Sequence, residues 1–202
     1  MRLKKIIDEI ATLPLLHIDY ITFSGAGEPT LAKNLSEMIQ GVRKIRKEKI
    51  AVITNSSLFD DENVREDLLL ADFVIAKLDA PVQSVFEQVN YPMPGIHLKR
   101  IIDGLKIFRQ AYKKKLALQI MFIARNKKYA KEIAQIAKEI NPDEVQINTP
   151  LRHCDVSPLS KVEISGLEKY FDGLKTISVY EAEIQKINSI SDEATLKRRG
   201  KI

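Results

Sequence analysis

A stretch of small residues with one carboxylate follows the first apolar run of the sequence. The run is 18–23, and Ser24-Gly25-Ala26-Gly27-Glu28 comes directly after it. Glycines let a backbone approach a ligand closely, because they have no Cβ atom, and a carboxylate pairs with a cation such as an ammonium group. The stretch therefore predicts a site for a polar, amine-bearing ligand. The alternative is that the glycines serve only a turn and that Glu28 only favours a helix N-terminus.

Polar residues also follow the other apolar runs, at the points where buried strands would end. If these runs are parallel strands, their carboxyl ends meet at one edge of a sheet and form one site. The opposite ends, such as Glu48-Lys49 and Asp143-Glu144, read as less organised, and this asymmetry favours a ligand at the carboxyl edge. The candidate residues are Thr54, Asn55 and Ser56 after the run 50–53, Lys77 and Asp79 at the end of the run 73–78, and Asn148 and Thr149 after the run that starts at Val145.

Lys77 is a charged residue in an otherwise apolar run, where an unpaired charge is costly. Asp79, two residues later, points to the same side of a strand and is one candidate partner. A substrate carboxylate is the other candidate, and the residues favour neither. A further interpretation places Lys77 and Asp79 in the acid–base chemistry of an ordinary β/α enzyme. Gln119 and Gln146 lie within predicted strands, and either face a barrel interior or bond to a neighbouring strand end.

The segments between these turns alternate between helical and strand patterns. Such alternation predicts parallel β/α units with right-handed crossovers, so the fold class is α/β. Five clear strands in 202 residues are too few for a closed eightfold barrel, which usually needs about 250 residues, and favour a partial barrel or an open doubly wound sheet. The predicted helices are 3–13, 35–45, 61–70, 82–89, 98–112, 129–140 and 165–171; the predicted strands are 18–23, 50–53, 73–78, 116–123 and 145–148, with 176–180 as a peripheral strand.

The composition is that of a globular chain with one core: 45% of the residues are hydrophobic and 29% are charged. Cys154 is the only cysteine, which excludes an intrachain disulfide and predicts a cytoplasmic location. No apolar run is long enough to span a bilayer, so no membrane contact is expected. The three histidines share no ligand spacing, and no metal site is expected. The net charge of +5 comes from basic tracts that read as solvated helix faces or as contacts to RNA phosphates.

Taken in order, these segments resemble the radical S-adenosylmethionine (radical SAM) superfamily. The stretch 22–31, which contains the glycines and Glu28, resembles the second-strand motif of that family. It is most similar to the branch related to the wybutosine-synthesis iron–sulfur oxidoreductases. Ile53-Thr54-Asn55-Ser56, Ala76-Lys77-Leu78-Asp79-Ala80, Gln119-Ile120-Met121-Phe122 and the segment 145–150 resemble, in turn, the ends of the third to sixth strands.

The resemblance implies a TIM-like partial (β/α)6 barrel that binds S-adenosylmethionine. It assigns the carboxyl ends of the strands to different parts of that cofactor. Ser24, Gly25, Gly27 and Glu28 would hold the methionyl ammonium group, Thr54, Asn55 and Ser56 would approach the ribose or the carboxylate, Lys77 and Asp79 would face the cofactor or the substrate, and Asn148 and Thr149 would lie at the adenosine end.

The sequence departs from the superfamily pattern at its start. In the family the first strand leads into a Cys-x3-Cys-x2-Cys loop, whose thiolates bind a 4Fe–4S cluster, and the reduced cluster cleaves S-adenosylmethionine to a 5′-deoxyadenosyl radical. This sequence contains neither that loop nor that strand. We therefore expect an N-terminally truncated oxidoreductase core over 1–182, without a cluster and inactive alone, followed by a polar tail over 183–202 that resembles the start of a lost C-terminal module.

The missing strand would leave the edge of the next strand exposed, which predicts self-association. The substrate expected from the resemblance is transfer RNA or a protein. The alternative function is that of a non-catalytic, degenerate β/α barrel that binds an adenosyl ligand or a partner.

Overall fold

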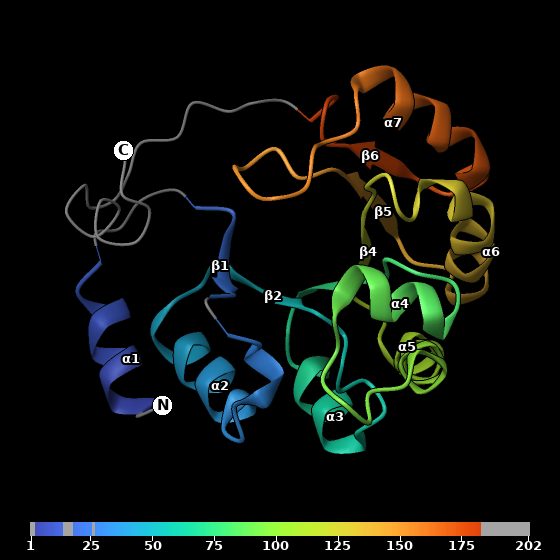
Figure 1. Ribbon diagram of the computed structural model, residues 1–202. Helices are drawn as coiled ribbons and strands as arrows, with labels where there is room; N and C mark the ends of the chain where they lie inside the picture. Colours follow the sequence, from blue (N-terminus) through green and yellow to red (C-terminus); the bar gives the residue numbers. More distant parts are fainter. Residues whose placement is uncertain (1–2, 14–17, 26, 183–202) are drawn as a thin grey trace.

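The core of the protein is one parallel six-stranded sheet in the order β1-β2-β3-β4-β5-β6. The structure is a computed structural model that describes residues 3–13, 18–25 and 27–182. Figure 1 shows the curved sheet with β1 and β6 at its two ends. It is therefore an open sheet, as the partial-barrel prediction requires. The strands are β1 (Tyr20–Phe23), β2 (Lys49–Thr54), β3 (Phe73–Lys77), β4 (Lys115–Met121), β5 (Glu144–Asn148) and β6 (Thr176–Ser178).

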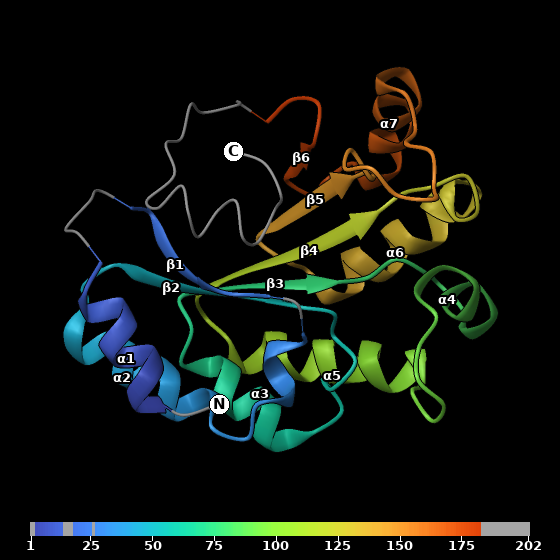
Figure 2. The ribbon, with the colours of Figure 1, turned by 60° about the vertical axis from the view of Figure 1, so that its left-hand side comes forward.

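The helices lie almost entirely on one side of the sheet. Figure 2 shows α1, α2, α3, α5 and α6 in a layer against this face, while α4 stands beyond the carboxyl ends of the strands. Right-handed crossovers between parallel strands produce this arrangement. The helices are α1 (Leu3–Ala11), α2 (Leu35–Ile45), α3 (Glu62–Leu69), α4 (Gln83–Asn90), α5 (Leu98–Ala111), α6 (Ala130–Ile140) and α7 (Lys161–Glu168), with 3-10 turns at Pro29–Leu31, Lys127–Tyr129 and Lys169–Phe171.

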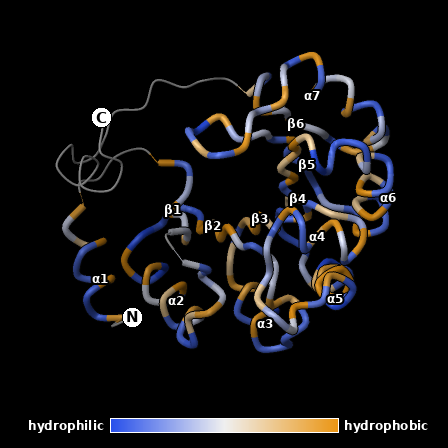
Figure 3. The backbone as a smooth tube through the Cα atoms, in the orientation of Figure 1, coloured by the Kyte–Doolittle hydropathy of each residue, from blue (hydrophilic) through white to orange (hydrophobic). Residues whose placement is uncertain are grey.

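The two faces of the sheet bury different numbers of side chains. The face toward the helices belongs to the main core, which includes Val52, Val74 and Leu118. Figure 3 shows hydrophobic residues along β2 and β3 and on the side of α5 toward them. The other face has a small cluster of Ala51, Phe73, Ile75 and Ala117, with Tyr20 and Ile53 packed on it, and all of these residues come from strands. Among the described residues, no helix therefore packs on this second face.

The predicted elements agree with the structure, with changes at their boundaries. The predicted peripheral segment forms β6, so the described chain has the five clear strands and this sixth one. Helix α7 begins at Lys161, earlier than predicted, because Ser160 and Glu163 form a capping box. Lys127 and Ser160 lower the pKa of Glu163 to about 2. The predicted tail 183–202 lies outside the described residues.

The amino edge of the sheet is more organised than the sequence suggested, so that expectation is wrong. Asp72, before β3, accepts hydrogen bonds from the backbone N–H of Ile50 (2.9 Å) and from Arg43 (2.9 Å). Asp143, before β5, repeats the pattern with the N–H of Leu116 (2.8 Å) and Arg109 (2.8 Å). Burial raises the pKa of both carboxyls, but these bonds outweigh it and leave both below their ordinary range. The charged residues at this edge thus fix strand register.

Helix α5 approaches the loop after β2 with no side chain between them. Gly104 faces the Phe59 carbonyl, and a Cβ atom added at Gly104 would lie 2.1 Å from that oxygen. Phe59 itself packs edge-on against Phe108, with ring centroids 5.3 Å apart. The glycine is therefore required by a close backbone approach rather than by a turn.

We predict opposite effects of alanine at two helical glycines. Gly104→Ala forces the backbone of Phe59 to move and should lower the free energy of unfolding by about 2 kcal/mol or more. Gly166→Ala, on α7, meets nothing within 4 Å and should raise it by about 0.5–1 kcal/mol through helix propensity. Urea unfolding of the two variants measures both values. Equal effects would contradict the close approach of α5.

Candidate functional site

The turn after β1 is tied to the end of β2 through Glu28. One carboxylate oxygen of Glu28 accepts from Thr30, at 3.1 Å from its backbone nitrogen and 2.7 Å from its Oγ1. The other accepts from the backbone N–H of Asn55 at 2.7 Å. Glu28 thus has a structural role as the N-cap of the turn Pro29–Leu31, which the sequence offered as an alternative. A carboxylate offers about four acceptor positions, so at least one remains for a ligand.

The glycines before Glu28 border open space. Ser24, Gly25 and Gly27 are exposed, and Glu28 is half-buried. A Cβ atom at Gly25 or at Gly27 would meet nothing within 4 Å. The turn therefore leaves room for a ligand close to the backbone, and neither glycine has a positive φ to explain it.

The turn after β2 contains the most strained residue of the predicted site. Ser56 has φ 68°, in the left-handed region, and is fully buried. The nitrogen of Ser56 donates to Thr54 Oγ1 at 3.1 Å, and the nitrogen of Ser57 donates to Asn55 Oδ1 at 2.9 Å. The hydroxyl of Ser56, however, has no hydrogen-bond partner. Backbone strain and an unsatisfied buried hydroxyl at one residue are typical of functional sites.

Lys77 and Asp79 form an ion pair at the end of β3, with Lys77 Nζ 3.2 Å from Asp79 Oδ2. The side chain of Asp79 is 1% exposed, whereas that of Lys77 is 29% exposed. Of the two candidate partners for Lys77, Asp79 is therefore the one with which it pairs in the structure. Because an ammonium group has three donors, this pairing leaves donors of Lys77 for a ligand.

The predicted residues at the end of β5 differ in accessibility. Thr149 is 2% exposed, and its Oγ1 accepts from the Leu159 nitrogen at 2.8 Å, which closes the loop 150–158. Asn148 is half-buried and pairs in register with Met121. Gln119 Nε2 donates to Gln146 Oε1 across the strands at 3.1 Å, and Lys77 lies in register with Gln119. Gln119 is two residues after Ala117 of the second-face cluster, so it lies on the face without a helix layer. Gln146 is in register with Gln119 and therefore lies on the same face.

Two further asparagines bond at this edge, and neither was among the residues that the resemblance assigned to the cofactor. Asn90, the last residue of α4, donates from Nδ2 to Asp79 Oδ2 at 2.6 Å. Asn126, fully buried, donates to the carbonyls of Asp79 (2.8 Å) and Met121 (2.9 Å). Their role depends on how α4 and the turn after β4 fold back over the strand ends, and no local pattern in the sequence reveals it.

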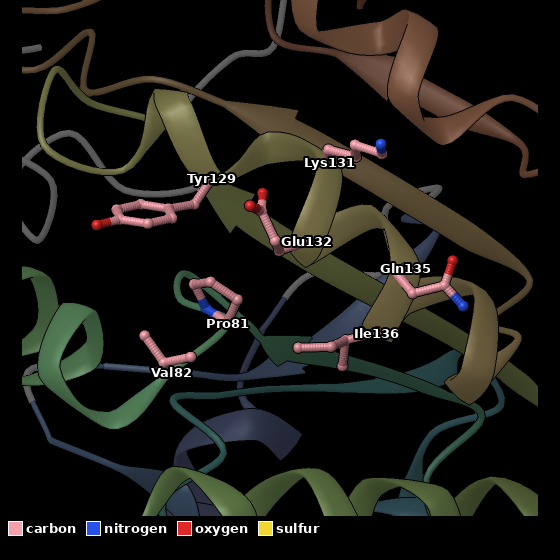
Figure 4. A pocket seen from close by; sticks show the side chains of 7 residues that line it. All are labelled: Pro81, Val82, Tyr129, Lys131, Glu132, Gln135 and Ile136. Carbon is pink, nitrogen blue, oxygen red and sulfur yellow. The ribbon is translucent and has the colours of Figure 1, made fainter.

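The structure has hollows on two different sides of these strands. A hollow of about 170 Å³ lies at the carboxyl ends of β3, β4 and β5 and includes Lys77, Asp79 and Asn90. A larger one, of about 570 Å³, lies between the β3–α4 connection, with Pro81 and Val82, and α6, with Glu132 and Ile136 (Figure 4). None of the predicted site residues lines the larger hollow. The smaller hollow is the one that belongs to the predicted edge.

Three further features of the described part of the chain concern metal sites, free cysteines and membrane-spanning helices. Residues 3–13, 18–25 and 27–182 contain no group of three histidine, cysteine, aspartate or glutamate residues that could hold a metal ion. Cys154 is an exposed free thiol in the loop after β5. Over the same ranges, no helix is both long enough and apolar enough to cross a bilayer.

The chain belongs to the radical SAM superfamily. The superfamily profile matches residues 1–140, which is more than half of the sequence. The resemblance drawn from the strand-end motifs is therefore confirmed.

Several known proteins are similar to this chain. "UPF0026 protein slr1464" of Synechocystis is 37% identical over 148 residues, which are 73% of this chain and 56% of that protein. The crystal structure of archaeal TYW1 has a TM-score of 0.59 at 21% identity, over 79% of this chain and 51% of that one. Streptococcus suis SuiB bound to S-adenosylmethionine has a TM-score of 0.57 at 17% identity, over 79% and 39%. These two structures support the partial-barrel fold.

The chain spans about half the length of the UPF0026 relatives that it matches.

We predict that the backbone of Ser56 is strained in the folded protein. Ser56→Gly removes both the left-handed strain and the unsatisfied hydroxyl, whereas Ser56→Ala removes only the hydroxyl. The glycine variant should therefore have a free energy of unfolding about 1 kcal/mol higher than that of the alanine variant. Urea unfolding measures the difference. Equal stability of the two variants would mean that the turn relaxes without strain.

Proposed function

We propose that this chain is the S-adenosylmethionine-binding part of a radical SAM oxidoreductase. Membership of the superfamily supports this, and so does the position of the glycine turn at the carboxyl edge. The observation that carries the proposal is the Glu28 carboxylate, which is held by Thr30 and Asn55 beside open space at Gly25 and Gly27. A fixed carboxylate next to such space suits the ammonium group of the cofactor.

The neighbouring residues suit the other groups of that cofactor. The buried Ser56 hydroxyl has an unused donor and acceptor for a ribose hydroxyl or a carboxylate. Lys77 has donors left for an oxygen of the cofactor or of the substrate. Asn148 is half-buried at the end of β5, and Thr149 would act through the loop that it closes. When bound and reduced, S-adenosylmethionine supplies a 5′-deoxyadenosyl radical for modification of a substrate.

The residues of this chain do not fit a 4Fe–4S cluster. A cluster held by three thiolates needs three cysteines, and the sequence contains one, Cys154. The cluster of the active protein would therefore be held by cysteines outside this sequence. We propose that the 202 residues bind the cofactor but do not cleave it alone, and that the whole protein works in the reducing cytoplasm.

We predict that Glu28 contributes to binding of S-adenosylmethionine by the isolated chain. Glu28→Gln keeps the size of the side chain but removes its charge, and should weaken binding roughly tenfold, as expected for a charge-assisted hydrogen bond. Calorimetry measures the affinity. The matched control is Glu66→Gln on α3, which is exposed and away from this edge.

A second ligand separates contact with the ammonium group from damage to the turn. 5′-Methylthioadenosine has no amino acid group, so Glu28→Gln should not change its affinity. Loss of binding of both ligands would assign Glu28 a structural role only. If neither ligand binds the unaltered chain, the proposed function fails.

We also propose that the outer edge of β1 pairs with a strand from the longer protein. β1 lies at the end of the sheet, and α1 packs its half-buried Leu3, Ile6, Ile7 and Ile10 mainly against α2. In a β/α layer each helix covers the strands before and after it. The position of α1 therefore favours a strand beside β1, and the segment that holds the cluster cysteines is our proposed occupant.

Without that occupant, the isolated chain should self-associate through the edge of β1. Light scattering after gel filtration should give a mass that rises with protein concentration. A stable monomer at all concentrations would contradict the exposed edge.

A further inference from the structure

The hollow at the ends of β3, β4 and β5 has a polar floor and an apolar wall. Lys77, Asp79 and Asn90 form the floor. Val89, Met121, Ile123 and Val156 contribute the wall. Its volume of about 170 Å³ corresponds to a small organic group rather than a single water molecule.

Asp79 is 1% exposed and is bonded to three neighbours, so it is not accessible to a ligand. Its Oδ2 accepts from Lys77 Nζ (3.2 Å) and from Asn90 Nδ2 (2.6 Å), while its Oδ1 accepts from the Met121 nitrogen (2.7 Å). Because Lys77 and Asn90 contact the same oxygen, the two side chains lie next to each other. The groups left for a ligand are therefore theirs.

The amide of Asn90 presents an unsatisfied acceptor. An ionised carboxylate only accepts hydrogen bonds, so the Nδ2 of Asn90 must face Asp79 and its Oδ1 must face away. This Oδ1 is buried and has no hydrogen-bond partner. A buried carbonyl without a donor is costly, so a ligand N–H or O–H would be favoured there.

The two free groups are complementary to an amide. Lys77 offers N–H donors to a carbonyl oxygen, and Asn90 Oδ1 accepts from an N–H. The lining side chains outside the floor are aliphatic apart from the thioether of Met121 and the thiol of Cys154, with no aromatic ring or arginine among them. Nucleobases are usually held by stacking on such groups, whereas a small aliphatic side chain fits this wall.

We propose that this hollow binds a secondary amide of the substrate, with its C=O on Lys77, its N–H on Asn90 Oδ1 and a small aliphatic substituent against Val89, Met121 and Ile123. The substrate class is thus a peptide segment or an N-acylated amino acid. This proposal rests on the proposed function, because it takes the amino acid end of the cofactor to occupy the neighbouring ends of β1 and β2.

Methionine methyl groups provide the test in the full 202-residue chain. Met121 lies in the wall of the hollow, and Met38 is buried in the helix-side core, so Met38 reports whether the fold is intact. With 13C-methyl methionine, N-acetylalanine methylamide should shift the Met121 resonance in a saturable manner and leave Met38 unchanged. N-acetylalanine methyl ester, which has no second N–H, should bind roughly tenfold more weakly.

Two variants test whether the Met121 response depends on Lys77. Lys77→Leu should weaken binding of the amide about tenfold with Met38 unmoved, whereas Lys138→Leu, on the exposed side of α6, should have no effect. The proposal is overturned if Met121 does not respond to the amide, if acetate or uridine shifts it as strongly, or if Lys77→Leu leaves the affinity unchanged. S-adenosylmethionine binding is measured separately on the same samples, so failure of the amide site leaves the cofactor result standing.

Discussion

The buried carboxylate of Asp79 is the interaction on which the carboxyl edge of the sheet depends. A carboxylate with 1% exposure is unfavourable unless it is fully hydrogen-bonded, and Asp79 has Lys77, Asn90 and the Met121 nitrogen as partners. These partners belong to β3, α4 and β4. Asn126 adds the backbone carbonyls of Asp79 and Met121 to the same network. One charge thus aligns two strand ends, a helix end and a turn.

The parallel sheet imposes the second constraint, since its crossovers place the helices on one face. The helix-side face is filled by apolar side chains, so the opposite face and the carboxyl edge are left to carry polar groups. Gln119 and Gln146 lie on that face in register, and Lys77 is in register with Gln119. The parallel strands therefore place Lys77, Gln119 and Gln146, which are distant in sequence, side by side across the sheet.

Local pattern was enough to predict the helices and strands of the fold. Helical and alternating spacings are properties of neighbouring residues, so the strands around Val52, Val74 and Leu118 were identified with small errors at their ends. The motif around Glu28 predicted superfamily membership, which the profile match confirms. The assignment of individual residues to the cofactor stays a prediction.

Partners across the fold could not be predicted, because they depend on how distant segments pack. Nothing near Glu28 in sequence indicates that Asn55 would donate to it, and nothing near Asn90 indicates Asp79. The same reason explains why the amino edge was misjudged. Asp72 and Asp143 read as unremarkable loop carboxylates until Arg43 and Arg109 are placed beside them by α2 and α5.

The close approach at Gly104 has a mechanical consequence for the site. The helix α5 meets the backbone of Phe59 directly, and the Phe59 nitrogen bonds to the Ser56 carbonyl at 3.2 Å. No compliant side-chain layer separates the two, so a shift of α5 along its axis must displace the Thr54–Ser57 turn by a comparable amount. Helix α5 and the carboxyl edge of the sheet are therefore mechanically coupled through backbone contacts.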